Sequence, residues 1–193
     1  MKTRVFVISI LSLGLALAGA GLWAQPLQAP QPIIVASCGQ SPAPIMMKVI
    51  LQKAGLPFQI EPLATVTELK AKGAKTLIIT MGASMKGMGA AGISIDDELA
   101  RTAALIDEAK KLKIVVIGAH IEGMKRRAQG ADAGDTTDEQ SIDAVAPKCD
   151  ILIVLKEGNA DNRFSDIAKA KKIPLIEVEK NLDLVAQLEK LFK

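Results

Sequence analysis

The sequence contains no tyrosine, and its 193 residues include only four phenylalanines, one tryptophan and one histidine. The single tryptophan, Trp23, lies close to the N-terminus. The rest of the chain therefore has almost none of the flat aromatic side chains on which nucleic-acid bases and sugars stack. This scarcity argues against a protein that binds single-stranded nucleic acid.

The first residues have the order of a secretory signal peptide. Lys2 and Arg4 precede an apolar run from Val5 to Leu22, and small residues follow, so we expect cleavage after Ala24. The run is long enough to span a bilayer, which leaves an uncleaved anchor as the less favoured alternative. Cleavage removes two cations and no acids, so the formal net charge falls from +3 to +1. We therefore expect an exported protein, periplasmic or extracellular, with no nucleic-acid partner and no membrane insertion after cleavage.

Two cysteines in an exported chain raise the question of a disulfide. Cys38 is expected at the C-terminal end of the first strand, and Cys149 directly before the fifth. In a parallel sheet these positions lie at opposite edges, roughly 20 Å apart, whereas a disulfide tolerates only about 7 Å between Cα atoms. The pattern predicts two free thiols.

Apolar, mostly β-branched runs alternate with helical patterns from residue 33 to the end of the chain. Continuous apolar runs are typical of strands that are buried on both faces. We expect strands at 33–37, 58–63, 75–81, 113–119, 150–155 and 174–178, and helices at about 42–54, 65–72, 95–111, 138–146, 162–171 and 181–192. This alternation predicts an α/β fold, a three-layer Rossmann-like sandwich with a mostly parallel sheet of about six strands and helices on both faces. The expected organisation is a signal peptide at 1–24, an extended linker at 25–32 and a single α/β domain at 33–193.

The stretch GMGAAG at 87–92 matches the G-x-G-x-x-G pattern of dinucleotide-binding folds. In those folds the glycines lie directly between a strand and a helix, but here five residues intervene after the strand. The next helix opens with the acids Asp96, Asp97 and Glu98, which would repel a pyrophosphate. We therefore expect no dinucleotide and no other cofactor. Two interpretations of 82–94 remain, a mobile surface loop or a ligand lid.

In open α/β sheets, ligands bind beyond the carboxyl ends of the strands, where the strand order reverses. With the order 3-2-1-4-5-6, the reversal would lie between the first and fourth strands. The segment SCGQSP follows the first strand, and GAHIEG follows the fourth. The candidate ligand-binding residues are Ser37, Cys38, Gly39, Gln40, Ser41, His120 and Glu122, with Lys86, Gly87 and Gly89 from the lid. In the lid interpretation, Lys86 meets an anionic group held by backbone N–H groups at the start of the first helix.

A cysteine, a histidine and a carboxylate at one crevice also suggest catalysis. Cys38 could act as a thiolate nucleophile, with His120 as its base and Glu122 to orient the histidine. As metal ligands these three residues fall short of the four that structural zinc takes, although three could suit a catalytic zinc. We rank a non-catalytic polar pocket above catalysis, and we expect no metal.

The segment after the fourth expected strand is basic at Lys125, Arg126 and Arg127 and then acidic from Asp132 to Glu139. Its polarity is typical of a solvated loop, and a partner surface is the alternative.

The motifs SCGQSP, KGMGAAGISIDDELAR, IGAHIEG, AVAPKCDILIV and IPLIEVEK occur together in this chain. In this combination the whole mature chain resembles a family of exported bacterial α/β proteins catalogued as a domain of unknown function. The resemblance implies an export signal and the six-unit sandwich. It assigns no ligand and no catalytic residue.

These observations favour a cell-envelope protein that is not an enzyme. It would bind a small, anionic ligand at the carboxyl ends of the strands, or serve as an accessory protein to an envelope partner. A thiol-dependent enzyme that uses Cys38 and His120 is one alternative. A partner-binding scaffold that docks through 125–139 is the other.

Overall fold

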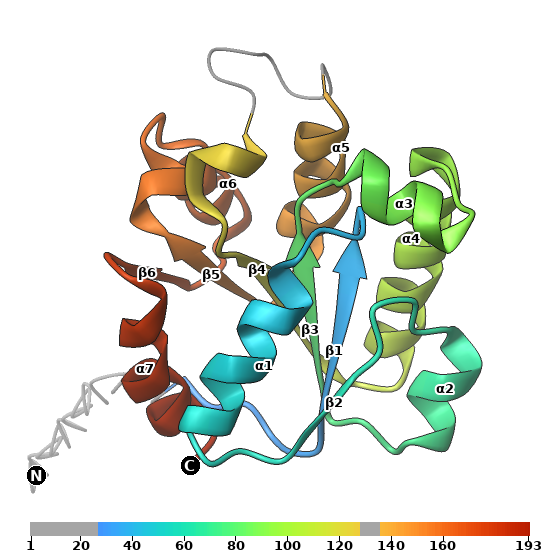
Figure 1. Ribbon diagram of the computed structural model, residues 1–193. Helices are drawn as coiled ribbons and strands as arrows, with labels where there is room; N and C mark the ends of the chain where they lie inside the picture. The colour runs from blue at the N-terminus through green and yellow to red at the C-terminus, as the bar shows by residue number, and fades with distance from the viewer. Residues whose placement is uncertain (1–26, 128–135) are drawn as a thin grey trace, which may run out of the picture.

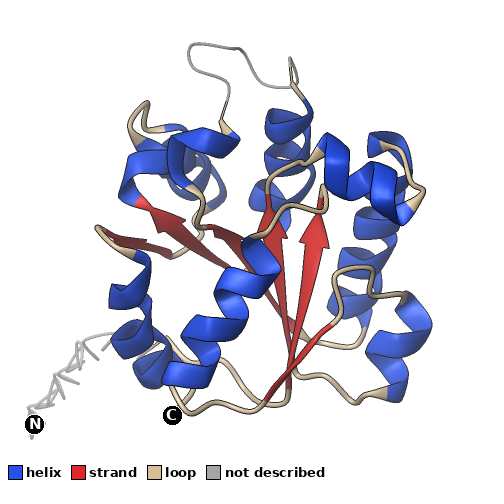
Figure 2. Cartoon of the chain, in the orientation of Figure 1, coloured by secondary structure: helices blue, strands red, loops and turns tan. Residues whose placement is uncertain are grey.

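The computed structural model describes residues 27–127 and 136–193. Six parallel strands form one sheet, with helices on both of its faces (Figures 1 and 2). The strands are β1 (Ile33–Cys38), β2 (Phe58–Ile60), β3 (Thr76–Met81), β4 (Val115–His120), β5 (Ile151–Leu155) and β6 (Leu175–Val178). The predicted α/β class and its parallel sheet are confirmed.

The helices also follow the predicted pattern, with one addition. They are α1 (Ala43–Lys53), α2 (Val66–Ala71), α3 (Met85–Ala91), α4 (Ile95–Lys111), α5 (Thr137–Val145), α6 (Arg163–Lys171) and α7 (Leu184–Leu191). Short 3-10 turns are η1 (Gly123–Arg126), η2 (Ala146–Lys148), η3 (Lys156–Asn159) and η4 (Asn181–Asp183). Ser94 and Asp97 form a capping box at the start of α4. No helix in the described ranges has the length and apolar character needed to cross a bilayer.

The two faces of the sheet bury separate cores. Helices α1 and α7 cover one face, where Met47, Leu51 and Leu188 pack on the odd-numbered side chains of β1. Helices α2, α4, α5 and α6 cover the other face, around Leu105 and Phe164. Because successive side chains of a strand point to opposite faces, every described strand residue of β1 and β3 is buried. This burial explains their continuous apolar sequence.

The strand order is β2-β1-β3-β4-β5-β6. The expected order 3-2-1-4-5-6 is wrong, because β3 and not β4 pairs with β1. The order therefore reverses between β1 and β3. This difference places a whole strand between the segment SCGQSP and the segment GAHIEG.

The expected loop at 82–94 contains the helix α3, which Ser84 caps by accepting a hydrogen bond from the Gly87 N–H. Gly87 lets this helix approach the β1–α1 loop, because a Cβ at position 87 would lie only 2.1 Å from the Gln40 carbonyl oxygen. Gly89, two residues later, has no heavy atom within 4 Å of its hypothetical Cβ. The glycine pattern that resembles a dinucleotide fingerprint therefore contains a packing contact.

This difference predicts opposite effects for two glycine substitutions in α3. Gly87→Ala should lower the free energy of unfolding by about 1–3 kcal/mol, because the new methyl group overpacks against backbone. Gly89→Ala should raise it by up to about 1 kcal/mol, because alanine favours a helix interior and meets nothing there. Urea unfolding followed by circular dichroism measures both values. Equal effects of the two substitutions would contradict the packing contact.

Candidate functional site

A buried carboxylate occupies the carboxyl end of β1. Glu98, in the first turn of α4, has a fully buried side chain. Its Oε2 accepts hydrogen bonds from the Gly39 N–H (2.8 Å) and from Nε2 of Gln40 (3.1 Å). Gly39 belongs to the segment SCGQSP, where the sequence predicted a ligand site. In the folded chain its N–H is already bound to an internal anion.

Arg101 compensates the charge of Glu98. Its Nε lies 3.0 Å from Glu98 Oε1, and its terminal nitrogens donate to the carbonyl oxygens of Ser37 (2.5 Å) and Ala64 (2.9 Å). A buried carboxylate is tolerated when it is paired and its oxygens are hydrogen-bonded, and both conditions hold here. The pair ties α4 to the ends of β1 and β2.

The loops that follow β1 and β3 close on each other above this ion pair. Gly39 has φ +102°, and a Cβ there would lie 2.6 Å from the Gly82 carbonyl oxygen, so the position requires glycine. An antiparallel bridge joins Gln40 to Ala83, and the Ser84 N–H donates to the Gly39 carbonyl (2.7 Å). The point where the strand order reverses is therefore closed by backbone contacts.

Cys38 and His120 do not meet. Cys38 pairs with Met81 of β3, and the imidazole of His120 lies on the far side of that strand, with Nδ1 3.1 Å from the Met81 carbonyl oxygen. Neighbouring strands are about 4.8 Å apart, so β1 and β4 are separated by roughly 10 Å. A base must come within about 3 Å of the proton donor, and this arrangement provides no such contact.

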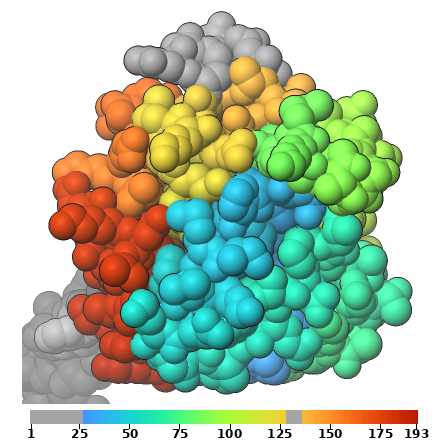
Figure 3. All heavy atoms as spheres, in the orientation of Figure 1, coloured from blue at the N-terminus to red at the C-terminus, as the bar shows by residue number. Residues whose placement is uncertain are grey.

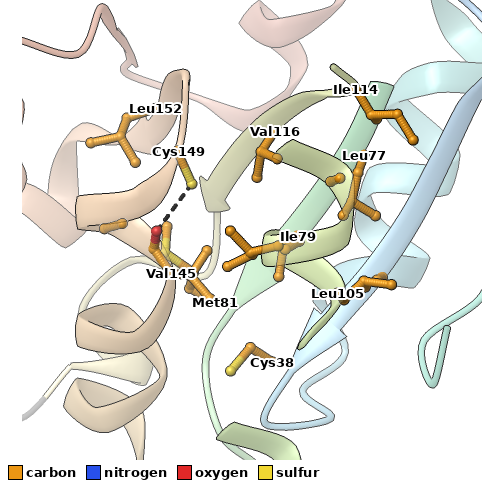
Figure 4. Close-up of a cluster of buried hydrophobic side chains, with 14 of the residues drawn as sticks. Cys38, Leu77, Ile79, Met81, Leu105, Ile114, Val116, Val145, Cys149 and Leu152 are labelled. Carbon is orange, nitrogen blue, oxygen red and sulfur yellow. Dashed lines mark hydrogen bonds between the residues drawn. The ribbon is translucent and has the colours of Figure 1, made fainter. Parts of the chain in front are cut away.

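Both thiols are free, as predicted, and both are buried. Figure 4 shows Cys38 and Cys149 among apolar side chains, with the Cys149 thiol donating to the Val145 carbonyl (3.2 Å). Burial raises the pKa of the Cys38 thiol to about 11, and it also raises the pKa of Cys149. A nucleophilic cysteine needs a lowered pKa, so neither thiol is activated.

His120 is enclosed on all sides that the structure describes. Its Nε2 lies 3.1 Å from the Gly123 carbonyl oxygen, and its ring stacks on Phe164 with centroids 5.1 Å apart. Burial lowers the pKa of His120, although the two backbone carbonyls oppose this shift. The imidazole is therefore a neutral core group at pH 7.

The serine hydroxyls of SCGQSP are used within the turn. Ser37 Oγ accepts from the Gln40 N–H (3.1 Å), and Ser41 Oγ accepts from the Ala43 N–H (3.3 Å). Of the lid residues, Lys86 is exposed on α3, and Gly89 lines an apolar cavity of about 270 Å³ beside Met85 and Met88. The structure thus distributes the candidate residues over three separate places.

Arg127 was expected to belong to a basic surface, but its side chain is almost fully buried. It pairs with Glu139 (2.6 Å) and Asp161 (2.5 Å), and its guanidinium lies 5.4 Å from the centroid of the Phe164 ring. Arg163 reaches the second oxygen of Glu139 at 3.1 Å. Residues 128–135 of the expected arm lie outside the described residues. Arg127 and Glu139, on either side of 128–135, are held by ion pairs. From the sequence these two charged residues could not be told apart from solvated ones.

An open cavity of about 360 Å³ lies beyond the carboxyl ends of β4 and β5. It is lined by Met46, Ile121, Glu122, Lys125, Leu155, Glu157 and Asn181. Glu122 is the one predicted ligand-binding residue in this lining. Ile121 and Lys125 lie close to Glu122 in the chain, whereas Met46 of α1, Leu155 of β5, Glu157 of η3 and Asn181 of η4 are far from it in sequence, so the pattern did not group them.

Two oxygens of the cavity residues have unmet hydrogen-bonding capacity. Glu122 Oε1 lies 3.3 Å from Arg126 Nε, but its Oε2 is buried without a hydrogen-bond partner among the described residues. This Oε2 lies beside Gly82, where an added Cβ would be 3.1 Å away. Asn181 donates to the Ile121 carbonyl (2.9 Å), and its Oδ1 is likewise buried without a described partner. Buried oxygens of this kind are costly unless a donor satisfies them.

No cluster of three or more histidine, cysteine or acidic side chains is placed to hold a metal ion within 27–127 and 136–193.

The comparisons with known proteins identify a family. The family model described as "Domain of unknown function (DUF6305)" matches residues 30–192. No curated protein matches the chain. Among solved structures, a GDSL-like lipase from Bacteroides thetaiotaomicron is 15% identical, with 77% of this chain and 71% of that chain covered and a TM-score of 0.33. The psychrotrophic esterase EstA from a Pseudoalteromonas species is 9% identical, with coverage of 77% and 78% and a TM-score of 0.34. At these values the neighbours carry no information on the activity of this chain.

The buried thiols predict slow chemical labelling. A maleimide or disulfide reagent at pH 7–8 should modify Cys38 and Cys149 far more slowly than a free thiol, and both should react fully in urea. The physical reason is that reaction requires an exposed thiolate, and burial removes both access and ionisation. Mass spectrometry of labelled peptides measures each site. Labelling of native Cys38 at the rate of a small-molecule thiol would contradict the closed β1 end.

The buried imidazole predicts a loss of stability in mild acid. Because the pKa of His120 is lowered in the folded state, the unfolded chain binds a proton below about pH 6.5 that the folded chain does not. The free energy of unfolding should therefore fall as the pH drops from 6.5 to 5, by up to about 1.4 kcal/mol per pH unit. His120→Gln should lack this slope in urea titrations. The lowered pKa values of Glu68 and Asp97 also reduce the free energy of unfolding in acid, but at a lower pH than His120 does.

Proposed function

We propose that this chain, which belongs to the family described as "Domain of unknown function (DUF6305)", is an exported cell-envelope protein that binds a small ligand without transforming it. The proposed site is the cavity beyond β4 and β5. Its volume of about 360 Å³ falls in the range of sites for small metabolites. Its place beyond the carboxyl ends of parallel strands is the usual one for ligands in this fold class.

The observation that carries the proposal is the polar lining of this cavity. Glu122 and Asn181 each have one buried oxygen without a described donor. Both residues lie in the lining, together with Glu157 and Lys125. The exposed carboxylate of Glu157 would accept from a ligand with N–H groups, and Met46 and Leu155 would contact an apolar part of it.

This lining favours an amine over the anionic ligand expected from the sequence. Two carboxylates and one ammonium give the lining a formal charge of −1, and Arg126 beside it pairs with Glu122, so the exposed Glu157 is the carboxylate without a cation partner in the lining. A phosphate or carboxylate could not bind the backbone N–H of Gly39, because this N–H already donates to the Glu98 carboxylate. We therefore infer a small primary amine or amino-acid-like ligand with an apolar portion.

A binding role accounts better for the side chains than a thiol-dependent enzyme does. The buried thiol of Cys38 has a raised pKa, and β3 separates it from His120. The nearby serine hydroxyls are engaged by backbone N–H groups. Export rests on the sequence alone, on the cations and the apolar run that precede Ala24.

The test is a thermal-shift screen of small amines and amino acids, with mono- and dicarboxylates as the opposite class, followed by calorimetry. Amines should raise the melting temperature, and Glu122→Gln should weaken the best amine roughly 10- to 100-fold through loss of a charged hydrogen bond. Met46→Trp should weaken it by filling the cavity. Glu189→Gln, an exposed isosteric change on α7, is the matched control and should leave affinity unchanged.

Two outcomes would contradict the proposal. One is a ligand whose affinity is the same in wild type, Glu122→Gln and Met46→Trp. The other is that the wild-type protein binds carboxylates more tightly than amines, and that Glu122→Gln does not increase the affinity for carboxylates.

A further inference from the structure

The arginines lie at one edge of the sheet, and a group of exposed lysines lies at the other. All four arginines after Arg4 follow the carboxyl ends of strands or begin helices there, and each makes a hydrogen bond within the fold. The opposite edge, where strands begin and helices end, carries lysines. Six exposed lysines lie near the ends of α2 and α4 and the starts of β3, β4 and β5. We call this group the lysine edge: Lys70, Lys75, Lys110, Lys111, Lys113 and Lys148.

Nearby acids neutralise only part of the lysine edge. Glu108 pairs with Lys70 (2.8 Å) and with Lys111 (3.6 Å). Asp150 lines a cavity with Lys110 and Lys113, and its carboxylate also accepts from the Val116 N–H (2.8 Å). Six lysines, these two acids and Asp107, which is exposed near the end of α4, leave an excess of three positive charges at this edge.

Compensation of helix dipoles explains the lysines in the last turns of α2 and α4, but not the whole set. Lys75 and Lys148 lie between a helix end and the next strand. Lys113 has φ +56°, a left-handed conformation that normally favours glycine, and indeed Gly55 and Gly73 occupy the equivalent places after α1 and α2. A lysine in this conformation is unfavourable relative to glycine.

Two adjoining cavities open at the lysine edge and share Ile114. One, of about 220 Å³, has an apolar floor of Leu69 and Ala74 and is bordered by Lys70 and Lys75. The other, of about 350 Å³, is bordered by Lys110 and Lys113. Leu112, 45% exposed, lies at the border of the first cavity. Cations beside an exposed apolar side chain suit a surface that has anionic groups above a hydrocarbon layer.

The described chain begins at this same edge. The Ala29 N–H donates to the Leu191 carbonyl (2.7 Å), which ties the start of the chain to the end of α7. Figure 1 places both ends of the described chain at the lower edge, and the lower margin of Figure 3 is the same edge. The residues that precede it include the apolar run from Val5 to Leu22. Because we expect this run to be cleaved after Ala24, docking would depend on the side chains of the lysine edge and not on an N-terminal anchor.

We propose that the lysine edge docks on an anionic phospholipid surface. The ligand cavity beyond β4 and β5 lies at the opposite edge of the sheet and so faces away from the bilayer. The docking surface does not depend on the proposed ligand or on the ligand cavity. Each lysine near an anionic bilayer contributes about a fivefold gain in partitioning at low salt.

The experiment measures partitioning of the full chain onto vesicles by sedimentation. The vesicles contain equal parts phosphatidylglycerol and phosphatidylcholine, or phosphatidylcholine alone, at 50 and 500 mM NaCl. The triple variant Lys75→Gln, Lys110→Gln, Lys113→Gln should bind the anionic vesicles roughly 10- to 100-fold more weakly than wild type at low salt. The matched variant Lys86→Gln, Lys156→Gln, Lys180→Gln changes the net charge equally at the opposite edge and should lose less than twofold. Any insertion of the N-terminal run contributes equally to all variants.

Replacement of the same three lysines by arginine should retain wild-type partitioning, which separates lost charge from lost folding. Equal weakening by the two glutamine triples would overturn the proposal, because net charge alone would then explain binding. Equal binding of wild type to neutral vesicles would also overturn it. Binding to soluble polyphosphate without binding to anionic vesicles would identify a polyanion as the occupant and would likewise overturn docking on a bilayer.

Discussion

The buried carboxylate of Glu98 is the constraint on which the carboxyl end of the sheet depends. It binds the backbone N–H after β1, and Arg101 neutralises it while holding the carbonyls of Ser37 and Ala64. Removing one member of such a buried pair leaves an uncompensated charge, which is strongly destabilising. The close approach of the β1–α1 and β3–α3 loops places Gly39 and Gly87 in positions where a side chain would clash.

This closure has a functional consequence. In this fold class the point of strand reversal is the usual ligand site, but here its donors and its space are used by the protein itself. The cavity that remains at this edge is displaced toward β4 and β5, where Glu122 and Asn181 have unpartnered oxygens. The opposite edge gathers lysines because every parallel helix ends there. The two edges of one sheet therefore differ in chemistry.

Much of the fold was predictable from the sequence because the relevant forces act locally. Apolar, mostly β-branched runs marked the six strands, and the acids at 96–98 marked the start of α4. The helix α3 was missed, since glycines at 87 and 89 are unfavourable in helices and a tertiary contact with Gln40 outweighs that preference here. Of the candidate site, Glu122 lies in the proposed cavity, whereas Cys38 and His120 are core groups.

The sequence by itself determined the six βα units and the parallel sheet, because hydrophobic periodicity and the direction of the chain fix these features. Tertiary structure alone decided the strand order, the burial of Arg127 and the closure of the β1 end by Glu98. The reason is physical. A charged side chain in an acidic or basic run looks the same in sequence whether it is solvated or buried, and only its partner across the fold, tens of residues away, decides which state is stable.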